Sequence, residues 1–327
     1  MLRSQKKLTI AIPTYNRANY LDILLNSILI QYTNVSEHLE LFVSDNASTD
    51  NTKEVVDKYL SLGLQIKYFC QRENLGPDRN IANCFIQSSG EYVWVMGDDD
   101  HFLPNAISVV LLQIIHDNDE IAIIHIGATT TKSLVPLDQP NINMKIVDKN
   151  TFVKKINVFL TFISGNIVNK NMFLKYETQD VIRTHFDTYM VQLSWIYKSI
   201  AVGDKFIICD TPLIVSTPDN TGGYSLFEIF ATNQSKIATK ELKDYPKLIK
   251  YIEKGTLLKF FPQWINLYLE GKMSSFIKDK DPFIILRSVY GKYFEFWAFI
   301  YPMKFLPKTL RRVFIKMIGL LNLVIRY

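Results

Sequence analysis

Residues 92–100, with the sequence YVWVMGDDD, join a short apolar run to three consecutive aspartates. An apolar run of this length is typical of a buried strand. Three adjacent carboxylates repel one another, and at the end of such a strand they cost stability unless a cation neutralises them. Carboxylate oxygens are the ligands that Mg²⁺ and Mn²⁺ prefer. The stretch therefore predicts a strand that ends in a divalent-metal site at Asp98, Asp99 and Asp100; the alternative is a solvated turn.

Apolar runs alternate with amphipathic stretches on both sides of this segment, which predicts an α/β domain with a mostly parallel central sheet. Strands are expected at Leu8–Ile12, Leu39–Val43, Gln65–Phe69, Tyr92–Met96 and Ile121–Ile126, and helices at Tyr20–Gln31, Asn51–Leu60, Asp78–Gln87 and Pro104–Ile115. Residues 129–143 are expected to form a loop or hairpin. Further on, the pattern predicts strands at Ile163–Asn169 and Val202–Ile208, a helix at Thr188–Lys198 and mostly helix from Lys236.

The charge and cysteine content exclude several classes of protein. Residues 301–327 carry six basic residues and no acid, so the net charge of +5 leaves the rest of the chain at −1. This distribution does not describe a nucleic-acid-binding surface. The three cysteines are far apart with no CxxC pair, which argues against disulfides or a zinc site. Residues 1–7 do not resemble a secretory signal, so a cytoplasmic location is expected.

The C-terminal tail, about 303–327, is predicted to be an amphipathic helix that lies on a membrane surface. Leu306, Leu310, Val313, Met317, Leu320 and Val324 step by threes and fours, and Lys308, Arg311, Arg312 and Lys316 fall on the other side of the helix. Such a helix is attracted to anionic lipid. The apolar stretch is too short for a membrane span. The alternative is a helix that packs on the protein's own core.

Polar residues also follow the first two predicted strands. The first runs into Pro13-Thr14-Tyr15-Asn16-Arg17 and the second into Asp45-Asn46-Ala47-Ser48-Thr49-Asp50. Ligands of open α/β sheets bind at the carboxyl ends of the strands. The acidic triplet and these two segments are therefore expected to surround one binding site.

Together with Asn74-Leu75-Gly76 and Arg79-Asn80, these motifs resemble family two of the inverting glycosyltransferases, which have the GT-A fold. The resemblance covers about the first third of the chain. It is strongest to the branch of abequosyltransferases and other O-antigen or capsule sugar transferases, which share Gly-Asp-Asp-Asp and a later Asp-Asn-x-Gly-Gly-Tyr, here Asp219–Tyr224. The commoner family motif has Asp where this chain has Gly97, so the resemblance aligns Asp99 and Asp100 with the metal ligands, and Asp98 is a possible substitute.

The resemblance implies a GT-A domain at 1–235, with a nucleotide-sugar half at about 1–126 and an acceptor half at about 127–235, and a helical region at 236–327. It implies Mn²⁺ or Mg²⁺ as cofactor, with Asp45 binding the base and Arg79 facing the base or the diphosphate. Nucleotide-sugar contacts are expected from Pro13, Thr14, Tyr15, Arg17, Asp45, Asn46, Asn74, Arg79, Asp98 and Asp99.

An inverting transfer also needs a base for the acceptor hydroxyl. The resemblance places it in Thr184–Thr188, where Asp187 is the first candidate and His185 the second; the alternatives are a helix N-cap for Asp187 and a packed histidine for His185. Acceptor or loop contacts are expected from Gly165, Asn166, Asn220, Gly222 and Gly223.

The expected function is transfer of a sugar from a nucleoside-diphosphate sugar to a glycan acceptor, polyprenyl-diphosphate-linked, at the inner face of the cytoplasmic membrane in surface polysaccharide synthesis. Two alternatives remain open: a sugar-phosphate nucleotidyltransferase, and a catalytically silent binding protein with the same fold. The former normally has a Gly-rich loop after the first strand, which Pro13–Arg17 lacks.

Overall fold

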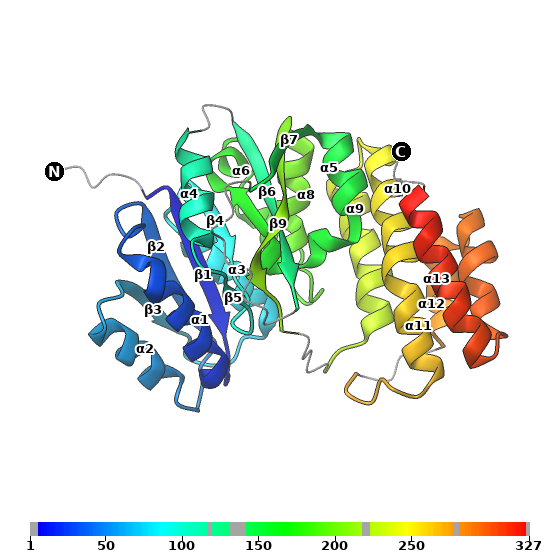
Figure 1. Cartoon of the computed structure of the whole chain (residues 1–327), viewed down its shortest axis with the longest axis horizontal. Coiled ribbons are helices and arrows are strands. Elements are labelled where there is room, and N and C mark those ends of the chain that lie inside the picture. Colours follow the sequence, from blue (N-terminus) through cyan, green and yellow to red (C-terminus); the bar gives the residue numbers. More distant parts are fainter. Residues whose placement is uncertain (1–5, 117–119, 131–141, 218–222, 277–280, 325–327) are drawn as a thin grey trace. The chain divides into compact units, whose positions relative to one another are not determined.

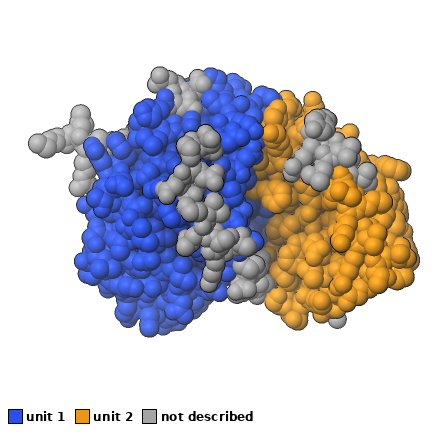
Figure 2. Space-filling view, viewed as in Figure 1, with its two compact units in different colours: residues 1–149, 160–218 blue, residues 150–159, 219–327 orange. Residues whose placement is uncertain are grey.

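The structure, a computed structural model, describes residues 6–116, 120–130, 142–217, 223–276 and 281–324, without the side chains of 321–324. The chain divides into two compact units, which Figure 2 colours separately. Unit 1 comprises Met1–Lys149 and Leu160–Pro218, and unit 2 comprises Asn150–Phe159 and Asp219–Tyr327. This division falls before the predicted boundary at residue 235, and the predicted domain assignment stays a prediction.

One sheet runs through unit 1 (Figure 1). Its described strands are β1 (Leu8–Thr14), β2 (Leu39–Asp45), β3 (Ile66–Cys70), β4 (Tyr92–Val95), β5 (His101–Phe102), β6 (Ile121–Thr129), β7 (Met144–Asp148), β8 (Asn166–Asn169) and β9 (Lys205–Val215). Their order is β3-β2-β1-β4-β8-β6-β9-β5, with β7 also beside β9. The neighbouring strands β3, β2, β1 and β4 are parallel to one another, as are β6 and β9. Strands β8, β5 and β7 pair antiparallel with their neighbours.

Helices cover both faces of the sheet in unit 1. They are α1 (Ala18–Tyr32), α2 (Thr52–Ser61), α3 (Pro77–Gln87), α4 (Ala106–His116), α6 (Lys170–Tyr176), α7 (Asp180–Arg183) and α8 (Gln192–Val202). The apolar rows of α1 and α4 share one core with alternate residues of β1 and β2. On the other face α3 packs on β1 and β2, α6 on β4 and α8 on β6 and β8. The predicted α/β class is thus confirmed.

Three predicted boundaries were wrong, for local reasons. Residues Ile163–Gly165 form a 3₁₀ turn, and β8 begins only at Asn166. Helix α8 ends at Val202 and β9 begins at Lys205. Between them a Cβ on Gly203 would lie 2.2 Å from Ala122 Cβ, so the close approach of the chain at this position requires glycine. The predicted helix at Thr188 begins only at Gln192. Most of the expected 129–143 loop lies outside the described residues, and β5 and β7 were not expected.

Unit 2 is helical, as predicted for the chain beyond Lys236. Its helices are most of α5 (Lys149–Ile156), then α9 (Gln234–Glu241), α10 (Pro246–Gly255), α11 (Phe261–Leu269), α12 (Pro282–Tyr290) and α13 (Lys308–Val324), with π-helical turns η3 (Glu228–Asn233), η4 (Thr256–Phe260) and η5 (Phe296–Ile300). Its core is rich in aromatics, among them Phe227 stacked on Phe261 at 5.7 Å between ring centroids. None of the described helices combines the length and apolarity that a membrane crossing requires.

Helix α13 packs on α11 and η4. Several of its basic residues contact unit 2, whereas the sequence predicted a basic face that is open to lipid. Arg311 is buried, and its Nε donates to Asn266 Oδ1 at 2.8 Å. Lys308 and Arg312 pair with Glu270 at 3.3 and 3.2 Å, and the nearby cations Lys272 and then Lys308 lower the pKa of Glu270 to about 2. The predicted apolar residues Leu310, Val313, Met317 and Leu320 are 41–65% exposed, and the paired side chains of Lys308 and Arg312 are 54% and 56% exposed.

Candidate functional site

A pocket of 290 Å³ lies in unit 1 at the carboxyl ends of β1 and β4. Parallel neighbours end at the same sheet edge, which is where open α/β sheets bind ligands. The pocket is also lined by Pro77, Ile81 and Ile163, which the motifs did not point to. It brings together the predicted residues Pro13, Thr14, Tyr15, Arg17, Asn46, Asn74, Asp98 and Asp99.

Arg17 joins the first motif to the acidic triplet. Its Nη1 donates to Asp98 Oδ1 at 2.8 Å and to Asp99 Oδ2 at 3.0 Å, and Thr14 Oγ1 donates to Asp98 Oδ2 at 2.8 Å. Both Asp98 oxygens therefore have donors from this chain. Burial raises the pKa of Asp98 to about 6, against the opposing effects of Arg17 and Thr14. Asp98 thus fixes the arginine in the pocket wall.

The carboxylates of Asp99 and Asp100 converge over Gly97. A Cβ at Gly97 would lie 3.1 Å from Asp99 Oδ1, 3.3 Å from Ser164 Oγ and 3.4 Å from Asp100 Oδ2. The Gly97 N–H donates to Ser164 Oγ at 2.9 Å, and the Thr217 N–H donates to Asp100 Oδ1 at 3.2 Å. Burial, with the neighbouring Asp99, raises the pKa of Asp100 to about 6. The missing side chain of Gly97 leaves room for these oxygens.

This oxygen-only set fits a hard divalent cation, as predicted. Among the described residues, no three His, Cys, Asp or Glu side chains are arranged to hold a metal ion by themselves. Two carboxylates suit an ion that completes its ligands with substrate phosphates and water. Asp98, with both oxygens already bonded, fits the metal-ligand role less well than Asp99 and Asp100.

The second motif is a hydrogen-bonded scaffold. Asp45 is 1% exposed; its Oδ1 accepts from Ser48 N at 2.8 Å and its Oδ2 from the Tyr68 hydroxyl at 2.6 Å. Burial, and then Asp45, raise the pKa of Tyr68. Asn46 Nδ2 donates to Asn74 Oδ1 at 2.8 Å, which ties the β2 loop to the loop before α3. Asp45 does not line the pocket, and its contact with a base stays a prediction.

Arg79 and Asp187 form an ion pair in unit 1, 2.7 Å between Nη1 and Oδ1. Arg79 is therefore the main cause of the lowered pKa of Asp187. The neighbouring Asp78 accepts from Tyr189 N at 2.8 Å and from Val191 N at 3.3 Å, so the start of α3 holds the loop that carries Asp187. Asp187 and Tyr189 have φ of 65° and 59°. The N-cap of α8 is Val191, so Asp187 does not cap that helix. The side chain of Asp187 is 75% exposed.

His185, Asn166 and Gly165 do not line this pocket. His185 is 4% exposed and Asn166 is 3% exposed; Asn166 Nδ2 donates to Phe162 O at 2.7 Å. Gly165 is buried, and a Cβ there would lie 2.9 Å from Phe162 Cδ1. Their roles stay predictions. Asn220 and Gly222 lie outside the described residues, and Gly223 in unit 2 has φ +81° and donates from its N–H to Ser275 O at 2.8 Å.

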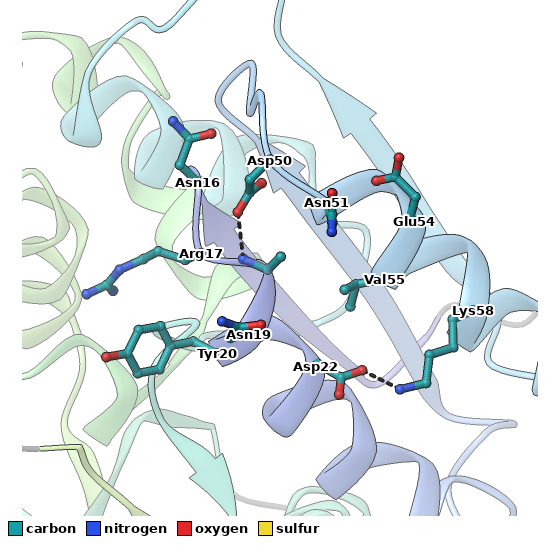
Figure 3. A pocket seen from close by; sticks show the side chains of 11 residues that line it. Asn16, Arg17, Asn19, Tyr20, Asp22, Asp50, Asn51, Glu54, Val55 and Lys58 are labelled. Carbon is teal, nitrogen blue, oxygen red and sulfur yellow. Dashed lines mark hydrogen bonds and ion pairs between the residues drawn. The ribbon is translucent and has the colours of Figure 1, made fainter.

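A second hollow of 610 Å³, which shares Arg17, lies between the first turns of α1 and α2 (Figure 3). Asp50 accepts from the N–H groups of Ala18 at 3.0 Å and Thr52 at 3.1 Å, so one carboxylate caps both helices. Figure 3 shows the Arg17 and Tyr20 side chains extending together, away from the Lys58–Asp22 ion pair. The Arg17 guanidinium lies 5.1 Å from the Tyr20 ring centroid. Asp50 thereby fixes the backbone next to Arg17.

Sequence reasoning missed Ser164, Thr217 and Asp78 as supports of the site. Thr217 Oγ1 donates to Asp99 O at 2.5 Å, but threonine after an apolar strand carries no specific signal. An aspartate in the first turn of a helix is common because its charge is favourable near the positive end of the helix dipole. The sequence therefore gave no sign that Asp78 binds the loop that carries Asp187.

Two curated bacterial relatives match part of this chain. An abequosyltransferase, RfbV, of Salmonella typhimurium is 38% identical over 104 residues, which are 32% of this chain and 31% of the relative. A GalNAc(5)-diNAcBac-PP-undecaprenol beta-1,3-glucosyltransferase of Campylobacter jejuni is 39% identical over 106 residues, 32% of this chain and 33% of the relative. The matches thus span only about a third of these relatives' length.

Solved structures share the fold. TarS 1-349 of S. aureus, in complex with UDP-GlcNAc, has a TM-score of 0.60 at 18% identity over 88% of this chain and 82% of that one. Mannosyltransferase PcManGT of Pyrobaculum calidifontis, in complex with GDP-Man and Mn²⁺, has a TM-score of 0.53 at 15% identity over 98% of this chain and 88% of that one. The predicted GT-A fold is thereby confirmed. A family model for glycosyl transferase family 2 matches residues 9–176, just over half of the chain, and the chain therefore belongs to that family.

Proposed function

We propose that this protein is an inverting glycosyltransferase that moves a sugar from a nucleoside-diphosphate sugar to a hydroxyl of a glycan acceptor in bacterial surface polysaccharide or glycoconjugate synthesis. The observation that carries the proposal is the pocket in which Arg17 and the Asp98–Asp100 loop meet at the ends of β1 and β4. Family membership and the names of both relatives support it.

The pocket suits a nucleotide and its diphosphate. Tyr15 is 40% exposed and presents an aromatic ring to a base, and Arg17 offers a guanidinium to phosphate oxygens. Asp99 and Asp100 would hold Mn²⁺ or Mg²⁺, which when bound stabilises the charge that develops on the leaving diphosphate. A GT-A neighbour whose complex contains Mn²⁺ supports this choice of cofactor.

Asp187 is the proposed base. The acceptor hydroxyl oxygen forms a bond to the anomeric carbon of the sugar, the bond from that carbon to the diphosphate oxygen breaks, and the hydroxyl proton passes to the Asp187 carboxylate. In the structure that carboxylate is held by Arg79. A donor diphosphate offers Arg79 more negative charge than a single carboxylate does, so we infer that donor binding draws Arg79 away and frees Asp187.

A lipid-linked acceptor and a place on the inner face of the cytoplasmic membrane are part of the proposal. The exposed apolar stripe Leu310, Val313, Met317 and Leu320 on α13 is the surface that would enter the bilayer interface. One relative is named for a substrate that carries PP-undecaprenol, which supports an acceptor of that kind.

A donor screen tests the activity. The full chain is incubated with a panel of nucleotide sugars and Mn²⁺, and release of nucleoside diphosphate is measured, with Asp99→Asn as the disabled variant. Release by the wild type and loss in the variant are expected. Pyrophosphate release from a nucleoside triphosphate and a sugar phosphate would instead identify a nucleotidyltransferase, and the absence of any turnover together with donor binding would identify a binding protein.

A further inference from the structure

Unit 2 contains a pocket of its own, of 280 Å³, whose lining is dominated by lysine. Its charged residues are Lys154, Lys155, Lys250, Lys254, Lys259 and a single acid, Glu295. Tyr251 and Leu258 add an apolar portion to the wall. All of these residues belong to unit 2, so the pocket is separate from the site in unit 1.

The lysines come from two segments that are far apart in the sequence and are held together by a tight contact between the Gly255 backbone and the Asn157 side chain. A Cβ on Gly255, at the end of α10, would lie 2.5 Å from Asn157 Cβ, so only glycine allows this approach. Asn157 Nδ2 donates to Lys154 O at 2.8 Å and to Lys155 O at 3.1 Å. The last turn of α5 is thereby fixed against α10, with its two lysines beside those of α10 and η4.

The charges of the pocket are not balanced by its own residues. Lys254 pairs with Glu295. The C-terminus of α5 supplies about half a negative charge, which partly offsets the lysine charges, whereas α10 continues directly into η4. Five lysines, one glutamate and one helix end leave about +3.5. Like charges this close repel one another, and a bound anion relieves that repulsion.

We propose that this lysine pocket is a binding site for a phosphate group, in particular a diphosphate or a phosphate ester with an apolar neighbour. Lysine ammonium groups bind phosphate as point charges, and several of them around one cavity match the multiple charge of a diphosphate. The apolar wall at Tyr251 and Leu258 suits the group esterified to it. Two sources share this chemistry: a lipid headgroup and a soluble diphosphate.

The test compares Lys154→Ala/Lys250→Ala with Lys243→Ala, which removes an exposed lysine of unit 2 outside the pocket. Binding of inorganic pyrophosphate to the full chain is measured by titration calorimetry in EDTA, at constant ionic strength. Flotation is measured with phosphatidylglycerol vesicles and with phosphatidylcholine vesicles. Loss of two charge-assisted contacts is expected to weaken binding by more than about tenfold, and Lys243→Ala is expected to leave it unchanged.

The two probes separate the sources. Weaker pyrophosphate binding in the double variant with unchanged flotation identifies a soluble diphosphate as the ligand. Reduced flotation on phosphatidylglycerol alone identifies a lipid phosphate. If the double variant binds both probes as the Lys243→Ala protein does, the proposal is overturned. Donor turnover in unit 1 is measured on the same samples and is expected to persist, so failure of this proposal and failure of the glycosyltransferase assignment give different results.

Discussion

Arg79 and Asp187 lie 108 positions apart in the sequence, yet two guanidinium nitrogens of one face the two carboxylate oxygens of the other at 2.7 and 3.3 Å. The pair places the proposed base beside Arg79, the arginine proposed to bind the donor diphosphate. It also keeps the base ionised, because Arg79 lowers the pKa of Asp187. If Arg79 moves from the Asp187 carboxylate to the donor diphosphate, donor binding releases Asp187 to accept the acceptor proton.

Asp187→Asn is expected to reduce sugar transfer by about 100- to 10,000-fold, because an amide cannot take the acceptor proton. Donor binding, measured by calorimetry, is expected to persist. Asp180→Asn is the matched control. Asp180 is an exposed aspartate whose described ion pair is with Arg183, three residues further along the same helix. Near-normal transfer by Asp187→Asn would refute its role as base.

Gly97→Ala tests the metal site without removing a carboxylate. The new Cβ would lie 3.1 Å from Asp99 Oδ1 and 3.4 Å from Asp100 Oδ2 and would displace them. Disturbing ligand positions typically costs about 10- to 100-fold in metal affinity, and a loss of that size is expected for Mn²⁺, measured by electron paramagnetic resonance. Gly127→Ala, where the nearest atom is 3.7 Å away, is expected to bind Mn²⁺ normally. Equal affinity in the two variants would argue against a site at Asp99 and Asp100.

His125 predicts part of the acid sensitivity of the fold. Its burial lowers its pKa from 6.5 to about 4, although a hydrogen bond to Asn166 opposes the shift. Between these values the unfolded chain binds a proton that the folded chain does not, so stability falls as the pH drops from 6.5 toward 4. The full effect is about 3 kcal/mol.

His125→Gln is expected to flatten this part of the stability profile, measured by urea unfolding at several pH values. Asp98 and Asp100 have raised pKa values and act in the opposite direction, but they are present in both proteins and cancel in the comparison. A profile with the wild-type slope in His125→Gln would show that His125 does not cause it.

At the scale of elements, α13 packs on its own unit through Phe314, Ile315 and Ile318 together with Arg311, and it exposes an apolar stripe on another face. Arg311 is buried, and Glu270 holds Lys308 and Arg312. The sequence pattern alone suggested the reverse, a basic face available to anionic lipid. Membrane attachment through α13 is therefore expected to depend on apolar burial more than on charge.

Leu310→Ser/Leu320→Ser is expected to reduce binding of the protein to lipid vesicles by more than about tenfold, because each buried leucine contributes about 1.5–3 kcal/mol. Ile30→Ser on α1 removes an apolar residue that is more exposed still, at 75%, and is expected to have no effect. Flotation at low salt and at about 1 M salt, where the Debye length is about 3 Å, separates the two forces. Binding that disappears at high salt but survives the serine substitutions would contradict this account.

At the scale of the whole molecule, two separate cores indicate two cooperative units. The core of unit 1 lies between the sheet and its helices, and that of unit 2 is formed by aromatics of α11, α12 and the π-helical turns. Units with their own cores often unfold as separate transitions.

Calorimetry is expected to show two thermal transitions. A nucleoside diphosphate with Mn²⁺ is expected to raise the midpoint temperature of only the transition that belongs to unit 1. At 100 times its dissociation constant such a ligand stabilises its unit by about 2.7 kcal/mol. Lys243→Ala provides a control that leaves both transitions in place. A single transition that shifts as a whole would show that the units unfold together.

The sequence by itself determined the α/β class, the parallel strands around the site and the family, and it pointed to many of the residues that line the pocket in unit 1. These follow from patterns within a few residues: apolar runs for β1 and β4, helix periodicity for α1, and polar motifs placed where strands end. Parallel strands then bring the ends of β1 and β4 together whatever the rest of the chain does.

Only the tertiary structure decided which partner each of these residues has. Arg17 on Asp98, Asp187 on Arg79, Ser164 under Gly97 and Gly255 against Asn157 are contacts between distant segments. No local pattern records such a pairing, because its energy depends on how whole elements pack. The same holds for the face that α13 buries. The sequence shows the helical period of α13, but it does not show that Asn266 is the partner of Arg311.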